Sequence, residues 1–435
     1  MKQIGSTHRQ LRSFFGRFGM TLMAIAWATV SMAQLSETTH AQGDASARTH
    51  YQVLYSFPLQ YGPAGSVPYA YVIPDAAGNL YGTTTIGGRG ADGGCPCGVV
   101  FEVDKTGKQT VLHSLDGATE GQDPWAALIR DSEGNFYGTA IQGGPAGLGS
   151  AFKLDKTGTV TVLHAFTGGE DGIYPVSALV RDAAGNLYGT TLGCGVYGGG
   201  CGDLWGKVFK VDTNGKETVL HTFSGGADGS VPMAGLIRDG AGNLYGTTSG
   251  GGASGSGGVV YKVDRTGKFS VLHSFSGADG IGPYMGHLIL DPAGSLYGTT
   301  QVGGAFASGV VFKVDPTGKE TVLYNFKGGE DFGHPTMPLV RDAAGNLYGT
   351  TYYGGGYYAC GGQAGCGTVF KVDTNGKETV LHRFRSGTDG ANPLQGLVVD
   401  SAGNLYGTTQ WGGDPNVQCG NTTTGCGAVF KLSLN

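Results

Sequence analysis

A seven-residue word, Gly-Asn-Leu-Tyr-Gly-Thr-Thr, occurs seven times in this chain with at most two letters changed. Its tyrosines lie 51 to 58 residues apart, at Tyr81, Tyr137, Tyr188, Tyr245, Tyr297, Tyr348 and Tyr406. A recurrence at this period is typical of repeat architectures, in which each copy is one supersecondary unit that cannot bury its apolar surface alone. The fold therefore follows from how seven such units associate.

Each repeat contains four short segments that predict β-strands. In the third repeat they are residues 178–182, 185–191, 208–212 and 219–223, which are rich in β-branched and aromatic residues and bounded by turn residues. Connections from first to second and from third to fourth segment keep one length throughout. Only the connection from second to third varies, from 15 to 24 residues between the tyrosine and the next aromatic residue. Constant spacing indicates tight hairpins, whereas the variable connection indicates a surface loop.

Four antiparallel strands repeated seven times predict an all-β fold, a seven-bladed β-propeller of four-stranded antiparallel blades. Residues 99–101 and 259–261 are apolar at consecutive positions, as expected when neighbouring sheets cover both faces of a blade. Asp182 and Asp212 each begin a short Gly-containing turn. Calcium binding is the alternative role of these turns, although each offers one carboxylate where calcium needs several oxygen ligands.

The two chain ends predict how the ring closes. A strand of the fourth type, residues 53–57, precedes the first repeat, and the last repeat stops at its third strand, residues 429–432. We expect the strand at 53–57 to complete the C-terminal blade, because closure removes the exposed edges that an open array would leave.

The first 33 residues predict a secretory signal peptide. A basic stretch ending at Arg17 precedes an apolar run at 20–30, and small residues follow at 31–33. An uncleaved membrane anchor is the alternative, although the run is shorter than the ~20 residues that a span needs. Residues 34–49 predict a linker, and residues 50–435 the propeller.

The charge of the remaining chain argues against a nucleic-acid partner. After the leader, 24 basic and 33 acidic residues remain, a formal charge of −9, whereas binding to a phosphate backbone calls for clustered Lys and Arg. We expect a secreted, periplasmic or cell-surface monomer without a membrane span in the mature chain.

The chain resembles the GloVer-type tandem repeat proteins, a group of bacterial exported repeat proteins, in the word carried by residues 242–248 and matched seven times between about residues 50 and 435. The resemblance implies export and a propeller-like repeat. Members often carry a C-terminal surface anchor, which this chain is not expected to have. The resemblance implies no established activity.

All eight cysteines lie in the four longest variable loops, as the pairs Cys95 and Cys97, Cys194 and Cys201, Cys360 and Cys366, and Cys419 and Cys426. In an exported chain this arrangement predicts one local disulfide per long loop. A metal site is the rival interpretation, but the pairs lie on different blades and lack partner histidines, so we expect no metal. A bridge between Cys95 and Cys97 would be strained, and reduced thiols or redox chemistry are its alternative.

Candidate ligand-binding residues follow from the face on which the variable loops emerge. The crossing from the fourth strand to the next blade emerges there too, and in five crossings an aspartate stands four residues before a proline: Asp171, Asp228, Asp279, Asp331 and Asp389. The functional interpretation places these carboxylates around the axial opening, as a calcium site or a negatively charged mouth. A plain Asp-Gly turn is the favoured alternative.

Aromatic residues of the same face are candidates to stack on a sugar or a peptide: Trp125, Tyr174, Tyr352, Tyr353 and Trp411. Five histidines share one position in the fourth strand, where we expect packing or hydrogen bonding rather than catalysis. His287 and His334 are not explained by the repeat and are further candidates.

Two functions stay open. The first is an exported non-catalytic module, without a required cofactor, that binds an extracellular protein or glycan or acts as a scaffold through its disulfide-stapled loops. The second is a propeller enzyme, namely a lyase, lactonase or glycan-acting hydrolase. An enzyme needs non-equivalent residues that converge, for which the candidates are His287, His334, Glu170 and Glu330. Near-identical blades favour the first function, and no catalytic residue is assigned.

Overall fold

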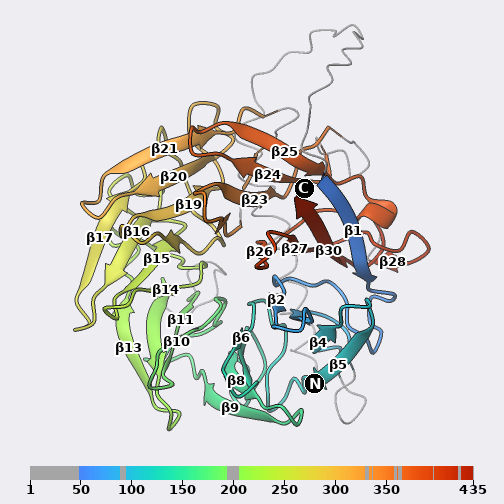
Figure 1. Ribbon diagram of the computed structural model, residues 1–435. Coiled ribbons are helices and arrows are strands. Elements are labelled where there is room, and N and C mark those ends of the chain that lie inside the picture. The colour runs from blue at the N-terminus through green and yellow to red at the C-terminus, as the bar shows by residue number, and fades with distance from the viewer. Residues whose placement is uncertain are drawn as a thin grey trace, which may run out of the picture.

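The computed structural model describes residues 49–88, 95–193, 205–328, 333–335, 337–356, 360, 365–394, 396–419 and 423–434. These residues form a ring of seven antiparallel four-stranded sheets, so the predicted seven-bladed β-propeller is confirmed (Figure 1). The predicted signal peptide and nearly all of the predicted linker lie outside this range. Within it, no helix has the length and apolarity that a membrane crossing requires.

The strands of a blade follow each other outward from the ring axis (Figure 1). The innermost strands are β2 (Ile73–Pro74), β6 (Ile129–Arg130), β10 (Val180–Arg181), β14 (Ile237–Arg238), β18 (Ile289–Leu290), β22 (Val340–Arg341) and β26 (Val398–Val399). The second strands are β3 (Leu80–Thr84), β7 (Phe136–Ala140), β11 (Leu187–Thr191), β15 (Leu244–Thr248), β19 (Leu296–Thr300), β23 (Leu347–Thr351) and β27 (Leu405–Thr409).

The third strands are β4 (Val99–Val103), β8 (Ser150–Leu154), β12 (Lys207–Val211), β16 (Val259–Val263), β20 (Val310–Val314), β24 (Thr368–Val372) and β30 (Ala428–Leu434). The outermost strands are β5 (Gln109–Ser114), β9 (Val160–Ala165), β13 (Glu217–Thr222), β17 (Phe269–Ser274), β21 (Glu320–Asn325), β25 (Glu378–Arg383) and β1 (Thr49–Ser56). A short pair, β28 (Gln418–Cys419) and β29 (Thr423–Thr424), and the 3-10 turn η2 (Gly387–Asp389) lie outside these sheets.

Ring closure occurs as the chain ends predicted. The outermost strand β1 pairs antiparallel with β30, from Thr49 opposite Leu434 to Ser56 opposite Ala428. The first and last described strands therefore share one blade. The backbone hydrogen bonds between β1 and β30 complete the seventh sheet and close the ring.

The polar residues of the repeated word form hydrogen bonds with the turn that precedes it. The Asp182 carboxylate accepts hydrogen bonds from the backbone N–H of Asn186 at 2.9 Å, from its side-chain amide at 2.8 Å, and from the Tyr188 hydroxyl at 3.0 Å. A tyrosine-to-aspartate bond of 2.9 to 3.1 Å recurs in all seven blades. Since the carboxylate is used by its own turn, the turn interpretation is confirmed at these positions.

The apolar residues of the repeated word pack against the neighbouring blades. Leu187 packs with Tyr137 of the preceding blade, whereas Tyr188 packs with Leu244 of the following blade. Phe209 of the third strand lies against Gly189 in the middle of the word and is fully buried. A propeller built this way keeps its core between blades, which leaves side chains at the axis and in the loops to carry function.

Candidate functional site

The aspartates predicted to ring the axis lie instead at the outer rim. Asp171, Asp228, Asp279 and Asp389 each bond a histidine of their own outermost strand, at 2.9 to 3.2 Å between Nε2 and the carboxylate. Each also accepts backbone N–H groups of its own turn, as Asp171 does from Thr167 at 2.9 Å. The axial placement was wrong because the aspartate stands at the outer start of the crossing. Asp331 and Glu330 lie outside the described residues.

The histidines of the fourth strands are confirmed as packing and hydrogen-bonding groups. His382 stacks on Tyr51 and His221 on Phe269, in each case across the junction to the next blade, with ring centroids 3.9 and 3.7 Å apart. His113 bonds Glu120 instead of an aspartate, and this hydrogen bond raises the pKa of its imidazole. Burial lowers the pKa of His221.

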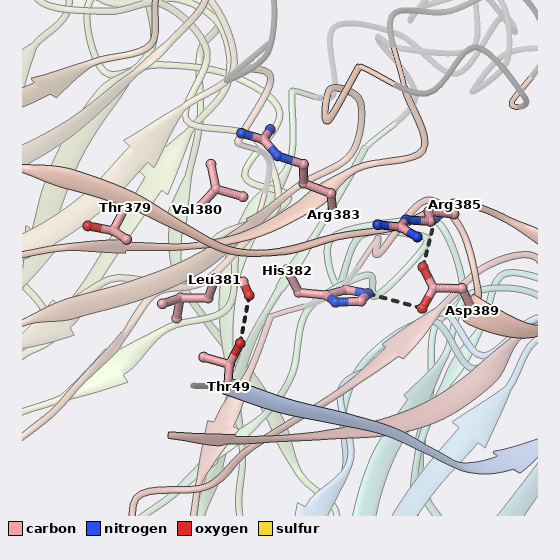
Figure 2. Close-up of a pocket in the computed structure, with 8 residues that line it drawn as sticks. All are labelled: Thr49, Thr379, Val380, Leu381, His382, Arg383, Arg385 and Asp389. Carbon is pink, nitrogen blue, oxygen red and sulfur yellow. Dashed lines mark hydrogen bonds and ion pairs between the residues drawn. The ribbon is translucent and has the colours of Figure 1, made fainter. Parts of the chain in front are cut away.

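A cavity of about 370 Å³ lies on this rim where β1 closes the ring (Figure 2). Thr49 donates to the Leu381 carbonyl at 3.1 Å, and the His382 imidazole bonds Asp389 at 3.1 Å (Figure 2). The backbone N–H of Arg385 donates to the same carboxylate at 2.8 Å. Since this histidine and acid repeat the rim pairs of other blades, the cavity belongs to the closure of the scaffold rather than to a distinct reactive site.

The opposite end of each crossing has an unusual backbone. The residue before the loop proline has a left-handed φ of 54° to 65° in all seven blades, at Val67, Asp123, Tyr174, Val231, Gly282, His334 and Asn392. For residues other than glycine this conformation costs about 1–2 kcal/mol. It persists because its backbone is bonded on both sides: the Tyr174 N–H donates to Leu148 of the preceding blade, and its carbonyl accepts from Leu192, both at 3.0 Å.

Disulfides support this bonding in the long loops. Cys95 is bonded to Cys97, Cys360 to Cys366, and Cys419 to Cys426. The second cysteine of each pair has a backbone carbonyl that accepts the N–H of the left-handed residue leading into the next blade. Cys97 accepts from Asp123, Cys366 from Asn392, and Cys426 from Val67. Local pairing is confirmed for the loops of Cys360 and Cys366 and of Cys419 and Cys426, and Cys95 and Cys97 also lie side by side within their own loop. Cys194 and Cys201 lie outside the described residues.

After the left-handed residue, the side chains of several blades meet around the ring axis. Trp125, Val176 and Met233 each follow a loop proline, and they pack with Ile141 and Leu192 into one buried apolar cluster. Tyr69, Tyr174, Val231, Tyr284 and Met285 pack against it and stay partly exposed. We call these ten residues the axial cluster. It joins side chains from five blades, so non-equivalent residues do converge here.

A hydrogen-bonded chain continues the axial cluster across blades 6, 7 and 1. The Tyr352 hydroxyl donates to the side-chain oxygen of Gln410 at 2.8 Å, and the Gln410 amide donates to the Tyr69 hydroxyl at 3.1 Å. Tyr69 in turn stacks on Trp125, with ring centroids 5.0 Å apart. Asn392 donates to the Tyr352 carbonyl at 3.0 Å. We call Tyr352, Gln410 and Asn392 the amide arc.

The remaining aromatic candidates surround the amide arc. Tyr353 packs edge-on against Tyr352 at 4.6 Å between centroids, and its ring lies 6.0 Å from that of His334. The Trp411 side chain interacts with Tyr352. The structure therefore brings the five aromatic candidates and His334 to the variable face near the axis, and separates them from the rim aspartates.

His287 lies close to a residue of a blade that is not its neighbour in the ring. Its ring lies 5.8 Å from that of Tyr71, although blades 5 and 1 are not neighbours. Burial lowers the pKa of His287 to about 4 and raises the pKa of Tyr71 to about 12, yet both side chains keep accessible surface. A side chain surrounded by protein but still accessible faces an internal opening, which we take to be the axial opening.

Burial also governs the tyrosines of the site. It raises the pKa values of Tyr174, Tyr284 and Tyr352, and nearby Tyr69 raises the last two further. All three hydroxyls are therefore neutral hydrogen-bonding groups at pH 7. Such a site can bind and orient a ligand by stacking and by neutral hydrogen bonds.

Sequence reasoning missed Tyr69, Tyr284, Gln410 and Asn392. The signal was present, because these residues occupy three positions of the repeat, before the loop proline, after it and after Thr-Thr, at which the blades differ.

The family model described as the Gloeobacter/Verrucomicrobia repeat matches residues 43–238 and 195–360. No curated protein sequence matches the chain. Among solved structures, a gluconolactonase from Xanthomonas campestris is 15% identical with a TM-score of 0.41, over 87% of this chain and 97% of that one. A luciferin-regenerating enzyme is 12% identical with a TM-score of 0.42, over 70% and 90%. Neither similarity carries an argument about activity.

Proposed function

The chain belongs to the Gloeobacter/Verrucomicrobia repeat family, and on this premise we propose that it is an exported, non-catalytic propeller that binds an extracellular protein or glycan on its variable face. The contact surface is formed by the partly exposed residues of the axial cluster and by Tyr352 of the amide arc, framed by the disulfide-stapled loops. The disulfides fit an oxidising, extracytoplasmic compartment.

One observation carries the proposal: non-equivalent aromatic residues of several blades converge at the axis on a rigid frame. The frame is held in one backbone conformation in all seven blades, and its loops are bonded to it at Cys97, Cys366 and Cys426. Preorganised aromatic surface is a favourable binding surface, because little conformational entropy is lost when a ligand arrives.

The test is a binding screen of the exported chain against arrays of extracellular glycans and bacterial surface proteins, with and without calcium. Each hit is repeated with Tyr284→Ala at the axis and with Tyr55→Phe on the outermost strand β1. We expect the axial substitution to weaken binding and the rim substitution to leave it unchanged. Hits that respond equally to both substitutions, or to neither, would falsify a binding site at the axis.

An enzyme at the axial opening is the second candidate, and His287 is the residue that favours it. Its lowered pKa keeps the imidazole neutral at pH 7, as a general base requires. The His287 ring packs against the ring of Tyr71. In the part of the chain that the structure describes, no group of three or more His, Cys, Asp or Glu side chains is suited to hold a metal. Turnover of lactones or glycosides that His287→Gln abolishes would establish this function instead.

A further inference from the structure

The lining of the axis has two chemically different sides. Blades 2 to 4 contribute a mainly apolar side, in which Trp125, Val176 and Met233 are at most 8% exposed and Tyr174 is partly exposed. Blades 5, 6, 7 and 1 contribute hydroxyl and amide groups, among them Tyr284, Tyr352 and Gln410. Because these apolar residues are buried, a ligand meets this side only through the partly exposed aromatic rings packed on it. It must therefore offer one apolar face to an aromatic ring and one face rich in hydrogen-bonding groups.

Tyr69 joins the two sides. Its ring is stacked on Trp125, which holds the aromatic plane in place, and its hydroxyl accepts the Gln410 amide. The ring stays partly exposed while Trp125 beneath it is buried. Tyr69 therefore presents a fixed aromatic surface beside a row of neutral polar groups.

The charge of the lining argues against an anionic ligand. Lysine and arginine are not among the described residues of the axial cluster and the amide arc, so an anion would find no positive partner there. The nearest acid in sequence, Asp123, is 7% exposed, and a buried carboxylate disfavours an anion still further. The tyrosine hydroxyls are neutral at pH 7 because burial raises their pKa values.

Resting on the proposed function, we propose that the ligand is an uncharged saccharide, bound through one pyranose unit at the axis. A pyranose ring has a face of C–H groups that stacks on an aromatic plane and an edge of hydroxyls that both donate and accept hydrogen bonds. The Tyr69 ring supplies the plane. The Tyr284 and Tyr352 hydroxyls supply the partners for the edge, and the buried Gln410 amide holds the Tyr352 and Tyr69 hydroxyls in place.

Intrinsic fluorescence gives a direct measurement, because Trp125 lies under Tyr69 while Trp205 packs against the core between blades 3 and 4. The exported chain is titrated with neutral oligosaccharides, such as glucans, mannans, galactans and chitin oligomers, and with acidic oligosaccharides. We expect a saturable signal with a neutral member that persists in Trp205→Phe, weakens in Trp125→Phe, and is lost when Trp411→Phe is added, because Trp411 also contacts the site at Tyr352.

Affinity variants then locate the sugar. Tyr69→Ala removes the stacking surface and should weaken binding at least tenfold, and Tyr352→Phe removes one hydroxyl and should weaken it roughly fivefold. Tyr55→Phe makes the same chemical change as Tyr352→Phe on the rim and should have no effect. Thermal melts of each variant show whether the ring is intact, and Tyr284→Phe replaces any variant that does not fold.

The outcomes separate the two proposals. Neutral-sugar binding that depends on Tyr69 and Tyr352 supports the saccharide. Binding restricted to acidic sugars, or neutral-sugar binding indifferent to Tyr69, overturns it. A protein ligand with the same dependence on Tyr69 and Tyr352 overturns the saccharide but keeps the proposed function. Absence of any ligand that depends on these residues overturns both.

Discussion

The glycine in the middle of the repeated word predicts a test of how the blades pack. A Cβ atom added at Gly189 would lie 2.7 Å from Cζ of Phe209 and 3.0 Å from Cδ2 of Leu179. Phe209 and Leu179 are buried at 0% and 1% exposure, so neither can move into solvent. Overpacking of this kind costs about 1–3 kcal/mol, whereas replacing glycine inside a strand returns about 0.5–1 kcal/mol of backbone entropy. We expect Gly189→Ala to lower the free energy of unfolding by about 1–2 kcal/mol.

The chain offers a matched control in Gly240, which lies in the turn before β15. A Cβ there would meet no heavy atom within 4 Å, and its φ is outside the left-handed region. Gly240→Ala should therefore be neutral or stabilise by about 0.4–1 kcal/mol, because it reduces only the freedom of the unfolded chain.

The assay is urea unfolding followed by circular dichroism, with Tm as a second measure. Adding Phe209→Leu to Gly189→Ala makes room for the new methyl group, so the double variant should be more stable than the sum of the single effects. If Gly189→Ala is as stable as Gly240→Ala, the close approach of Phe209 does not explain the glycine, and the packing argument is refuted.

Three further predictions concern buried polar groups. Tyr261 stands where six blades have Phe, and its hydroxyl lacks a hydrogen-bond partner among the described residues; Tyr261→Phe should stabilise by about 1 kcal/mol in urea unfolding, and a loss of stability would contradict this. Burial, followed by nearby Asp171, raises the pKa of Glu217 to about 7. The native state thus holds this proton more tightly than the unfolded chain, and stability is lost as pH rises from the ordinary glutamate pKa of 4.5 to about 7. After allowance for partial exposure, Glu217→Gln should stabilise by roughly 1 kcal/mol at pH 8 and change nothing at pH 4 in thermal melts. Burial alone would raise the pKa of Asp131, but hydrogen bonds from Asn135 and Tyr137 outweigh it and hold the pKa at about 2. Asp131→Asn should be less stable than the parent at pH 7 and equally stable near pH 2. A difference in stability that stays the same at both pH values would refute this.

The scaffold was predictable because its interactions are short in sequence. Asp182, Asn186 and Tyr188 lie within six residues of each other, and turn chemistry at that range can be inferred from residue types. Ring closure was predictable for a different reason. Counting strand types left one strand missing at the C-terminal end and one in excess before the first repeat, and β1 and β30 pair accordingly.

The site was predictable only in part. The variable face, Trp125 and Tyr352 followed from loop lengths and residue type, but the rim aspartates were placed at the wrong end of their crossing. A repeat pattern shows which residues are equivalent in each blade. It does not show how far from the ring axis each residue of a crossing lies. Tyr69 and Gln410 meet although 341 residues separate them, because the ring brings its ends together, and no local pattern records that contact.

The departures from the repeat show which positions the fold leaves open. Where one letter recurs in every blade, a scaffold contact explains it, as the Tyr188 hydroxyl on Asp182 does. After the loop proline the backbone is equally constant, with a left-handed residue before it in all seven blades. Yet the side chains there range from Met233 through Trp125 to Tyr284. Since packing between blades tolerates all of these, the scaffold does not dictate them, and an asymmetric ligand at the axis can distinguish blades only at such positions. This is why we place binding at the inner ends of the crossings, and why exchanging the partly exposed axial residues, such as Tyr69 and Tyr284, should change ligand preference before it changes stability.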